Sequence, residues 1–451
     1  MKRLLLTLAV VAVAVASCQK DVVYHDTPEQ NQSVELAYSN TRSYDEALEI
    51  AEGALKLLDG DDTRSTTKRV IKRSEGQTVM RPVTRGGEVN DEPIMYVFNN
   101  EDNQGFTIIA ADRSQQPIIA VTEYGNYTYG EPTGVEPFDL LMEDVATSLS
   151  ILPEDPLAIR IETTGRIENF RYGPTTNVQW GTGSIYGSMY PDGVAYVEAA
   201  AIAQAIMGVP ANTYYTITNP DDALYGHTIT LDVQSMCSHI RDDYHGNILH
   251  PCTDDIHNDI SRLYLEIGYR LSNGTNIGLS DKTTPFTLSK MRSVLASFGV
   301  TAGDNTYINS FPWFAPTNPM IMILPTYSLF VYRGKLGGVL SKKSHTWLAT
   351  GCYYYHFYEI EFTLNRILNP NHPDPTGYTE TNRELKYDAM YYMNWGYDGY
   401  SNGWFAAGCF DMSKRETIPN YMPEIPERST LNYNFSDVQL FEVINDLYNI
   451  N

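Results

Sequence analysis

The order of two kinds of segment constrains the fold more than any other feature of the chain. Apolar residues recur at helical spacing over 194–207, 258–271 and 288–298. From Pro319 to Asp411 the pattern changes to short strand-like runs separated by turns. Helices followed by a block of antiparallel strands are typical of an α+β domain. The second half of the chain is therefore predicted to be α+β.

A smaller unit precedes this domain. Apolar positions at helical spacing predict a helix at each of its ends, and turn-separated apolar runs predict strands between the helices. The predicted helices are 43–58 and 136–149, and the predicted strands are 94–98, 105–110 and 117–121. A polar turn at 99–103 joins the first two strands as a hairpin. We therefore predict a small α+β module with an antiparallel sheet at 36–155.

The N-terminus has the features of a lipoprotein signal. A lysine and an arginine precede the apolar stretch Leu4–Val15, which is too short to span a bilayer comfortably. Val15-Ala16-Ser17-Cys18 matches the bacterial lipobox, whose cysteine is lipidated. The alternative is an ordinary cleavable signal that happens to end at a cysteine. We expect residues 1–18 to be the signal and lipidated cysteine, and polar residues 19–35 to be a tether. The protein would then be held in the bacterial cell envelope, at the outer membrane or cell surface, by lipid alone.

The charge of the chain excludes one class of partner. The formal net charge is −23, from 55 acidic and 32 basic residues. A nucleic-acid-binding protein needs a basic face, so we expect no nucleic-acid partner. Residues 60–90 form a locally basic run, which docks a partner, offers a cleavage site or is a solvated flexible loop.

Four cysteines remain after Cys18: Cys237, Cys252, Cys352 and Cys409. An exported protein can form disulfides, and four cysteines allow three pairings. Residues 237–257 contain two of these cysteines and four histidines, but the spacing matches no compact zinc motif. A zinc site, a disulfide and free side chains all stay open for this stretch. We predict no metal site and no cofactor.

Several motifs resemble those of streptopain-type cysteine peptidases. Residues 391–405 read Tyr-Tyr-Met-Asn-Trp-Gly-Tyr-Asp-Gly-Tyr-Ser-Asn-Gly-Trp-Phe and contain the Asn-Trp-Gly-x-x-Gly-x-x-x-Gly stretch of that family. Ser344-His345-Thr346-Trp347 is similar to the strand that carries its catalytic histidine, and Val178–Tyr186 to the start of the mature enzyme. Gly-Phe-Thr-Ile-Ile-Ala-Ala-Asp-Arg at 105–113 resembles its propeptide and inhibitor module.

The resemblance implies a fold and a set of site residues. Residues 172–412 would form a papain-like domain, preceded by the propeptide-like module and followed by a C-terminal extension at 413–451. His345 matches the catalytic histidine, which serves as base and then as acid. Asn394 and Trp395 match the pair that orients and covers that histidine.

The nucleophile of the family has no counterpart in this chain. The family begins its helix with Gly-Cys-Val-Ala-Thr-Ala-x-Ala-Gln, where this chain reads Tyr-Val-Glu-Ala-Ala-Ala-Ile-Ala-Gln from Tyr196. The nucleophile position falls on Val197, or on Tyr196 or Glu198 with a shift of one residue. None of these side chains can attack as a thiolate. The position of the family's oxyanion glutamine is Thr182, which has no amide donor.

These observations predict a lipid-anchored streptopain-like peptidase homologue that is catalytically inactive. It would act by binding a peptide or protein in the old cleft, or by presenting its inhibitor-like module to a protease. Two alternatives stay open: a cysteine peptidase with full or residual activity, and a surface scaffold or adhesin.

Overall fold

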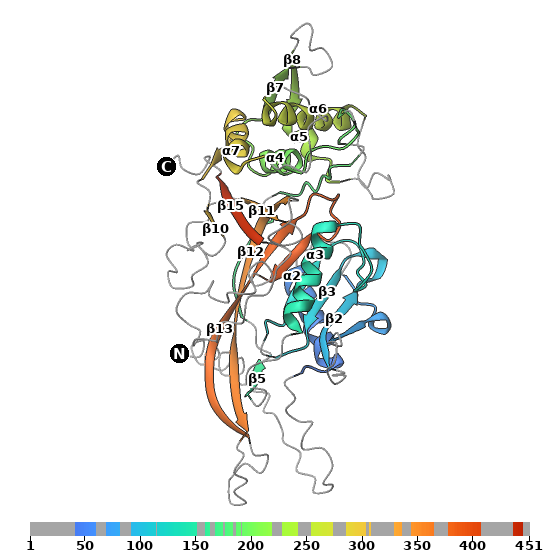
Figure 1. The fold of residues 1–451 in the computed structure, drawn as a ribbon, viewed down its shortest axis with the longest axis vertical. Coiled ribbons are helices and arrows are strands. Elements are labelled where there is room, and N and C mark those ends of the chain that lie inside the picture. Colours follow the sequence, from blue (N-terminus) through green and yellow to red (C-terminus); the bar gives the residue numbers. More distant parts are fainter. Residues whose placement is uncertain are drawn as a thin grey trace, which may run out of the picture. The chain divides into compact units, whose positions relative to one another are not determined.

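The structure, a computed structural model, describes most of the chain from residue 41 onward (Figure 1). The signal and Cys18, the tether, and the parts 60–68 and 82–91 of the basic run lie outside the described residues, as do Cys252 and Cys409. The described ranges are 41–59, 69–81, 92–113, 115–150, 158–162, 167–174, 176–183, 186–190, 192–218, 228–241, 254–273, 286–303, 306–307, 329–335, 344–364, 378–406 and 436–444.

The helices agree closely with the predicted ones. In the module they are α2 (Tyr44–Asp59) and α3 (Glu136–Leu149), with short 3₁₀ turns η2 (Arg73–Glu75) and η3 (Glu101–Asn103). In the second half they are α4 (Val197–Gly208), α5 (Val233–Cys237), α6 (Asp254–Leu271) and α7 (Leu288–Ser297). The predictions at 43–58, 136–149, 194–207, 258–271 and 288–298 are confirmed to within a few residues, and the short α5 was not predicted.

A capping box forms the start of helix α2. The backbone N–H of Ser43 donates to the Glu46 carboxylate over 2.8 Å, and the N–H of Glu46 donates to the Ser43 hydroxyl over 3.3 Å. This reciprocal pair satisfies N–H groups that a helix start leaves without partners. Just before it, the buried Arg42 guanidinium donates to the carbonyls of Ala110, Asp112 and Gln115. The start of the described chain is thereby fixed to the module.

One large sheet, with every pair antiparallel, connects the two halves of the chain. Among the described residues it follows the order β1-β2-β3-β4-β14-β13-β12-β11-β15-β10, with β5 and β6 pairing with β12 and β9 with β15. Its strands are β1 (Gln77–Met80), β2 (Pro93–Asn99), β3 (Phe106–Ala110), β4 (Ile118–Thr122), β5 (Ala158–Glu162), β6 (Ile167–Tyr172), β9 (Thr301–Ala302), β10 (Thr306–Tyr307), β11 (Leu329–Lys335), β12 (Ser344–Leu364), β13 (Tyr378–Asn394), β14 (Gly403–Ala406) and β15 (Ser436–Ile444). A separate hairpin joins β7 (Tyr214–Thr218) and β8 (Thr228–Asp232). The predicted α+β class with antiparallel strands is confirmed.

The sheet draws on residues on both sides of the range 172–412. Strand β15 lies in the segment expected to be a C-terminal extension, and it pairs with β11 from Leu329↔Val443 to Lys335↔Ser436. Strands β5 and β6 precede residue 173 and pair with the long strand β12. Figure 1 shows β12 and β13 as a long curved ribbon.

Alternation of side chains along the module strands sends apolar groups to both faces of the sheet. Met95 and Val97 of β2 belong to the core that α3 covers, and Tyr96 and Phe98 belong to the core that α2 covers. The module sheet is therefore buried on both faces. A third core packs α4, α6 and α7 together and includes Leu348 of β12.

No helix in the described part of the chain has the length and apolar character needed to cross a bilayer.

Candidate functional site

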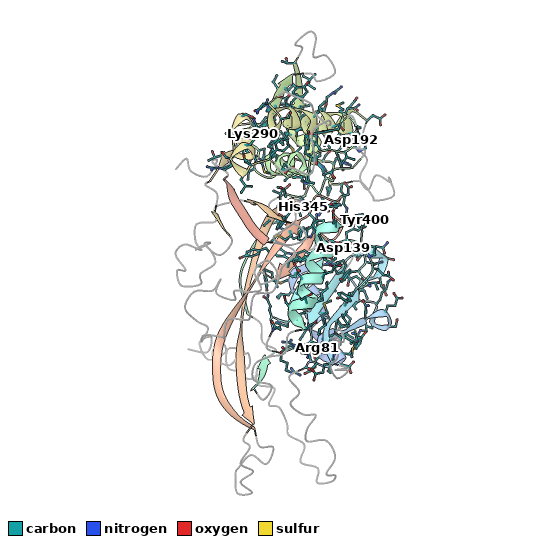
Figure 2. All side chains as sticks on the ribbon, in the orientation of Figure 1. Arg81, Asp139, Asp192, Lys290, His345 and Tyr400 are labelled. Atoms are coloured by element: carbon teal, nitrogen blue, oxygen red, sulfur yellow. The ribbon has the colours of Figure 1, made fainter. Side chains whose placement is uncertain are left out.

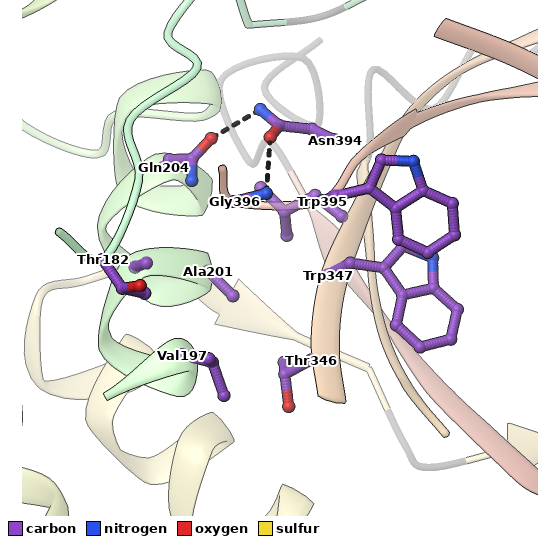
Figure 3. Close-up of a pocket in the computed structure, with 11 residues that line it drawn as sticks. Thr182, Val197, Ala201, Gln204, Thr346, Trp347, Asn394, Trp395 and Gly396 are labelled. Carbon is purple, nitrogen blue, oxygen red and sulfur yellow. Dashed lines mark hydrogen bonds between the residues drawn. The ribbon is translucent and has the colours of Figure 1, made fainter. Parts of the chain in front are cut away.

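A narrow groove runs between α4 and the ends of β12 and β13 (Figure 3). It has no space large enough for a water molecule. Its lining contains three kinds of group: small or aliphatic side chains, amides and hydroxyls, and indoles. The lining residues are Thr182, Val197, Ala200, Ala201, Gln204, Thr346, Trp347, Leu348, Asn394, Trp395 and Gly396. None of these side chains is a thiol, an acid or a base.

Val197, at the predicted nucleophile position, is the first residue of α4. Its neighbour Tyr196 is the N-cap in an extended conformation, and Tyr196 makes no side-chain capping hydrogen bond. Figure 3 shows Val197 facing Thr346 of β12 across the groove. Glu198 is buried in the first turn of α4, where the helix dipole favours a carboxylate. The helix start therefore presents an aliphatic side chain to the groove.

Thr182, at the predicted oxyanion position, also lines the groove. Its carbonyl accepts a hydrogen bond of 3.0 Å from the N–H of Ala195, which ties the segment 176–183 to the entry of α4. Thr182 and Val197 thus line the same groove.

His345 lies at the start of β12 but is not among the groove residues (Figure 2). Its ring is stacked with that of Trp347, at a centroid distance of 6.1 Å and an interplanar angle of 8°. Its Nε2 lies 2.9 Å from the carbonyl oxygen of Trp395. Because a carbonyl can only accept, this Nε2 carries the proton. Burial lowers the pKa of His345 to about 4, although the hydrogen bond to Trp395 acts in the opposite direction. The imidazole is therefore neutral at pH 7.

Asn394, expected to orient the histidine, is part of a different buried network. Its Nδ2 donates to the Gln204 Oε1 over 2.5 Å and to the Val178 carbonyl over 3.1 Å. Its Oδ1 accepts from the N–H of Gly396 over 3.1 Å. Gln204 in turn donates to the Trp180 carbonyl over 2.8 Å. These two amides join the start segment, α4 and the turn after β13.

The turn after β13 is held by its own side chains. The N–H of Trp395 donates to the Asn402 Oδ1 over 2.9 Å, and the indole Nε1 of Trp395 donates to the Ser401 carbonyl over 3.0 Å. Asp398 accepts from the N–H of Gly181 over 2.8 Å. Gly396 has a positive φ of 77°, which glycine adopts without strain. The Asn-Trp-Gly stretch thus has a structural role at each of these positions.

The described cysteines and histidines form no second site. Cys237 is a free thiol in α5, with a pKa raised to about 11 by burial and then by Asp232. The rings of His239 and His257 are 4.9 Å apart, and the Tyr186 hydroxyl lies 2.9 Å from the His239 Nε2. Within the described ranges, no three His, Cys, Asp or Glu residues are grouped so that they could hold a metal. The pairings that involve Cys252 and Cys409 lie outside the described residues.

Sequence reasoning missed the role of Gln204. It closes the helix motif that the chain shares with the family, so the motif match was a signal for it. A glutamine inside the apolar run 199–207 is the other signal, because such an amide is expected to be buried and a buried amide needs hydrogen-bond partners. In the structure Gln204 is 1% exposed.

Comparison with known proteins identifies the N-terminal module. Residues 32–147 match the family model described as Spi protease inhibitor. The predicted relation of this module to protease inhibitors and propeptides is therefore confirmed.

Two solved structures are similar to parts of the chain. A fragment of prointerpain A from Prevotella intermedia is 14% identical, with 81% of this chain and 98% of that chain covered and a TM-score of 0.42. Active interpain A cysteine protease from Prevotella intermedia is 15% identical, with 60% and 94% covered and a TM-score of 0.33. No curated protein matches the sequence.

Proposed function

We propose that this protein is a non-catalytic relative of streptopain-type cysteine peptidases that acts by binding a protein partner. The observation that carries the proposal is the start of α4. An aliphatic side chain, Val197, stands there in a groove where none of the described lining side chains is ionisable and where there is no room for a water molecule. Peptide hydrolysis through an acyl-enzyme needs a nucleophile, a base beside it and space for water.

The neighbouring groups do not compensate for the missing thiol. Thr182 has no amide to donate to an oxyanion, and loss of one such donor alone typically costs about a hundred- to a thousandfold in rate. His345 is neutral and donates its Nε2 proton to a backbone carbonyl. The nucleophile, the base and the oxyanion donors of a peptidase act as a unit. A change in any one of them therefore lowers the hydrolysis rate, and the three changes together should abolish it.

The filled groove also bears on how binding would occur. Of the two binding modes expected from the sequence, capture of a peptide in the old cleft would require α4 to separate from β12 and β13. That separation would break the buried hydrogen bond from Asn394 to Gln204. The groove therefore favours a partner that binds on the outer surface of the protein. The residues of the former cleft would then serve to hold α4 against β12 and β13.

Restoring the missing groups tests the catalytic half of this proposal. Val197→Cys combined with Thr182→Gln should give at most weak thiol-dependent hydrolysis of a peptide ester, because the pair supplies a nucleophile and an oxyanion donor but neither a base beside the thiol nor space for water. Either change alone should give less than the pair. Ala201→Cys is the matched control, because it places a thiol in the same groove one turn further along α4. Turnover by the unmodified protein that an alkylating agent blocks would refute the proposal.

We propose in addition that Cys18 is lipidated and holds the protein in the cell envelope, as its lipobox indicates. Several acyl chains give stable anchoring, whereas one is marginal. Cys18→Ala should move the protein from the detergent phase to the aqueous phase, and persistence in the detergent phase would contradict the lipid anchor.

A further inference from the structure

The Spi-type module and the second half of the chain meet along a seam that consists of β4 and β14. The two strands pair antiparallel, with Thr122 opposite Gly403 and Ala120 opposite Phe405. Strand β4 pairs with β3 on its other edge, and β14 pairs with β13 on its other edge. The seam is therefore an interior ladder of one continuous sheet, and separation would create two unpaired edges.

Apolar cores cross the seam on both faces of the sheet. On the α3 face, the ring of Phe138 lies 6.2 Å from that of Phe405. On the α2 face, the core that contains Ala51 and Phe98 also contains Trp404. Trp404 is 1% exposed and Phe405 is 0% exposed. Removing the module would uncover both aromatic side chains, at a large cost in apolar burial.

Polar contacts close the end of the seam. The Tyr392 hydroxyl donates to the Glu123 carboxylate over 2.6 Å. The N–H of Glu123 donates to the Asn402 carbonyl over 3.0 Å. The ring of Tyr124 packs against that of Tyr400 at 4.6 Å, and the Arg241 guanidinium lies 3.9 Å from the centre of the Tyr124 ring. Two adjacent module residues thus contact three separate segments of the second half.

The backbones approach so closely at Gly403 that no side chain fits there. A Cβ on Gly403 would lie 2.3 Å from the Val121 carbonyl oxygen and 2.5 Å from the Thr122 Cα, and the residue has φ +158°. Both neighbours are backbone atoms of the module, so they cannot move aside as a flexible side chain can.

We propose that the Spi-type module is a permanent part of the folded protein, which the seam holds in place even when the chain is cut. A cut in the connection between α3 and β5 would leave the two pieces bound. The inference does not depend on whether the groove is catalytic, so its test and the hydrolysis assay can fail separately.

The test is to cut the full chain and ask whether the pieces separate. Residues 151–157 are replaced by the recognition sequence of a site-specific protease, the protein is cleaved under native conditions, and the product is passed over a size-exclusion column. Both fragments should elute together at the position of the uncut protein and should separate only when urea unfolds the protein. Elution of the N-terminal fragment by itself in native buffer would overturn the proposal.

A pair of glycine variants tests whether the seam is what keeps the two cut fragments together. Gly403→Ala in the cleavable chain should raise the fraction of separated fragments at least tenfold over the matched control Gly53→Ala. Gly53 lies in α2 with nothing within 4 Å of an added Cβ. Equal retention of fragments by the two cut variants would show that the seam does not hold the module. If Gly403→Ala does not fold, the cut chain with native Gly403 still decides the proposal.

Discussion

Burial of His345 should make the stability of the folded protein depend on pH. Its pKa is about 4 in the folded protein, against about 6.5 for an unperturbed histidine. Between these values the unfolded chain binds a proton that the folded protein does not, so stability falls as the pH is lowered. The contribution is fully present above pH 6.5 and is lost as the pH falls toward 4. The difference corresponds to roughly 3 kcal/mol.

Urea denaturation of the native protein and His345→Gln at several pH values measures this contribution. The stability of the native protein relative to the variant should decrease by about 2–3 kcal/mol between pH 7 and pH 4. Carboxylates that titrate in the same range contribute to both proteins and cancel in the difference. Tyr397, whose ring lies 5.8 Å from that of His345, has a pKa raised to about 12 by burial and then by Glu136, and stays neutral. A pH-independent difference would contradict the burial of a neutral imidazole.

The sequence could place individual site residues but not their hydrogen bonds. One groove is lined by all four of Thr182, Val197, Asn394 and Trp395. The motif could not reveal that Trp395 contacts His345 through its backbone carbonyl, because a sequence pattern records side chains and not carbonyl directions. The closure of the groove depends on packing between distant segments, which no local pattern contains.

At the scale of elements, the residues of the Asn-Trp-Gly turn and of the α4 motif have structural roles that do not depend on catalysis. Asn394 and Gln204 are buried amides whose bonds join three segments far apart in the sequence. Losing either amide would leave carbonyls or N–H groups without partners in an apolar interior. The structural role of these residues gives a physical reason for them that does not depend on catalysis.

Gln204→Leu should therefore reduce the free energy of unfolding by about 2–4 kcal/mol, since the Trp180 carbonyl and the Asn394 amide each lose a buried partner. Gln234→Ala, on the exposed face of the short helix α5, is the control and should change stability by less than about 0.5 kcal/mol. Equal, small effects of both substitutions in urea denaturation would mean that the amide network is not structural.

Periodicity predicted the longer helices well, because an amphipathic stripe is visible in a single segment. The prediction at 258–271 corresponds to α6, Asp254–Leu271, which begins four residues earlier in an acidic first turn. The pairing of β15 with β11 could not be predicted, since strand partners far apart in sequence are selected by the whole sheet.

At the scale of the whole molecule, one continuous sheet joins the Spi-type module and the second half of the chain. The order of the sheet passes from β4 directly to β14, so module strands and C-terminal strands are neighbours. The sequence predicted both halves but not this connection, because nothing in the pattern of either strand specifies the other.

The most direct test of the central claim is the hydrolysis of casein or a peptide ester by the purified, unmodified protein. We predict no turnover above background, and no change on addition of an alkylating agent, because Val197 stands at the start of α4 and the groove is filled. The double variant Val197→Cys with Thr182→Gln is measured in the same assay and should show at most weak turnover. Turnover by the unmodified protein that alkylation blocks and His345→Ala abolishes would contradict the account.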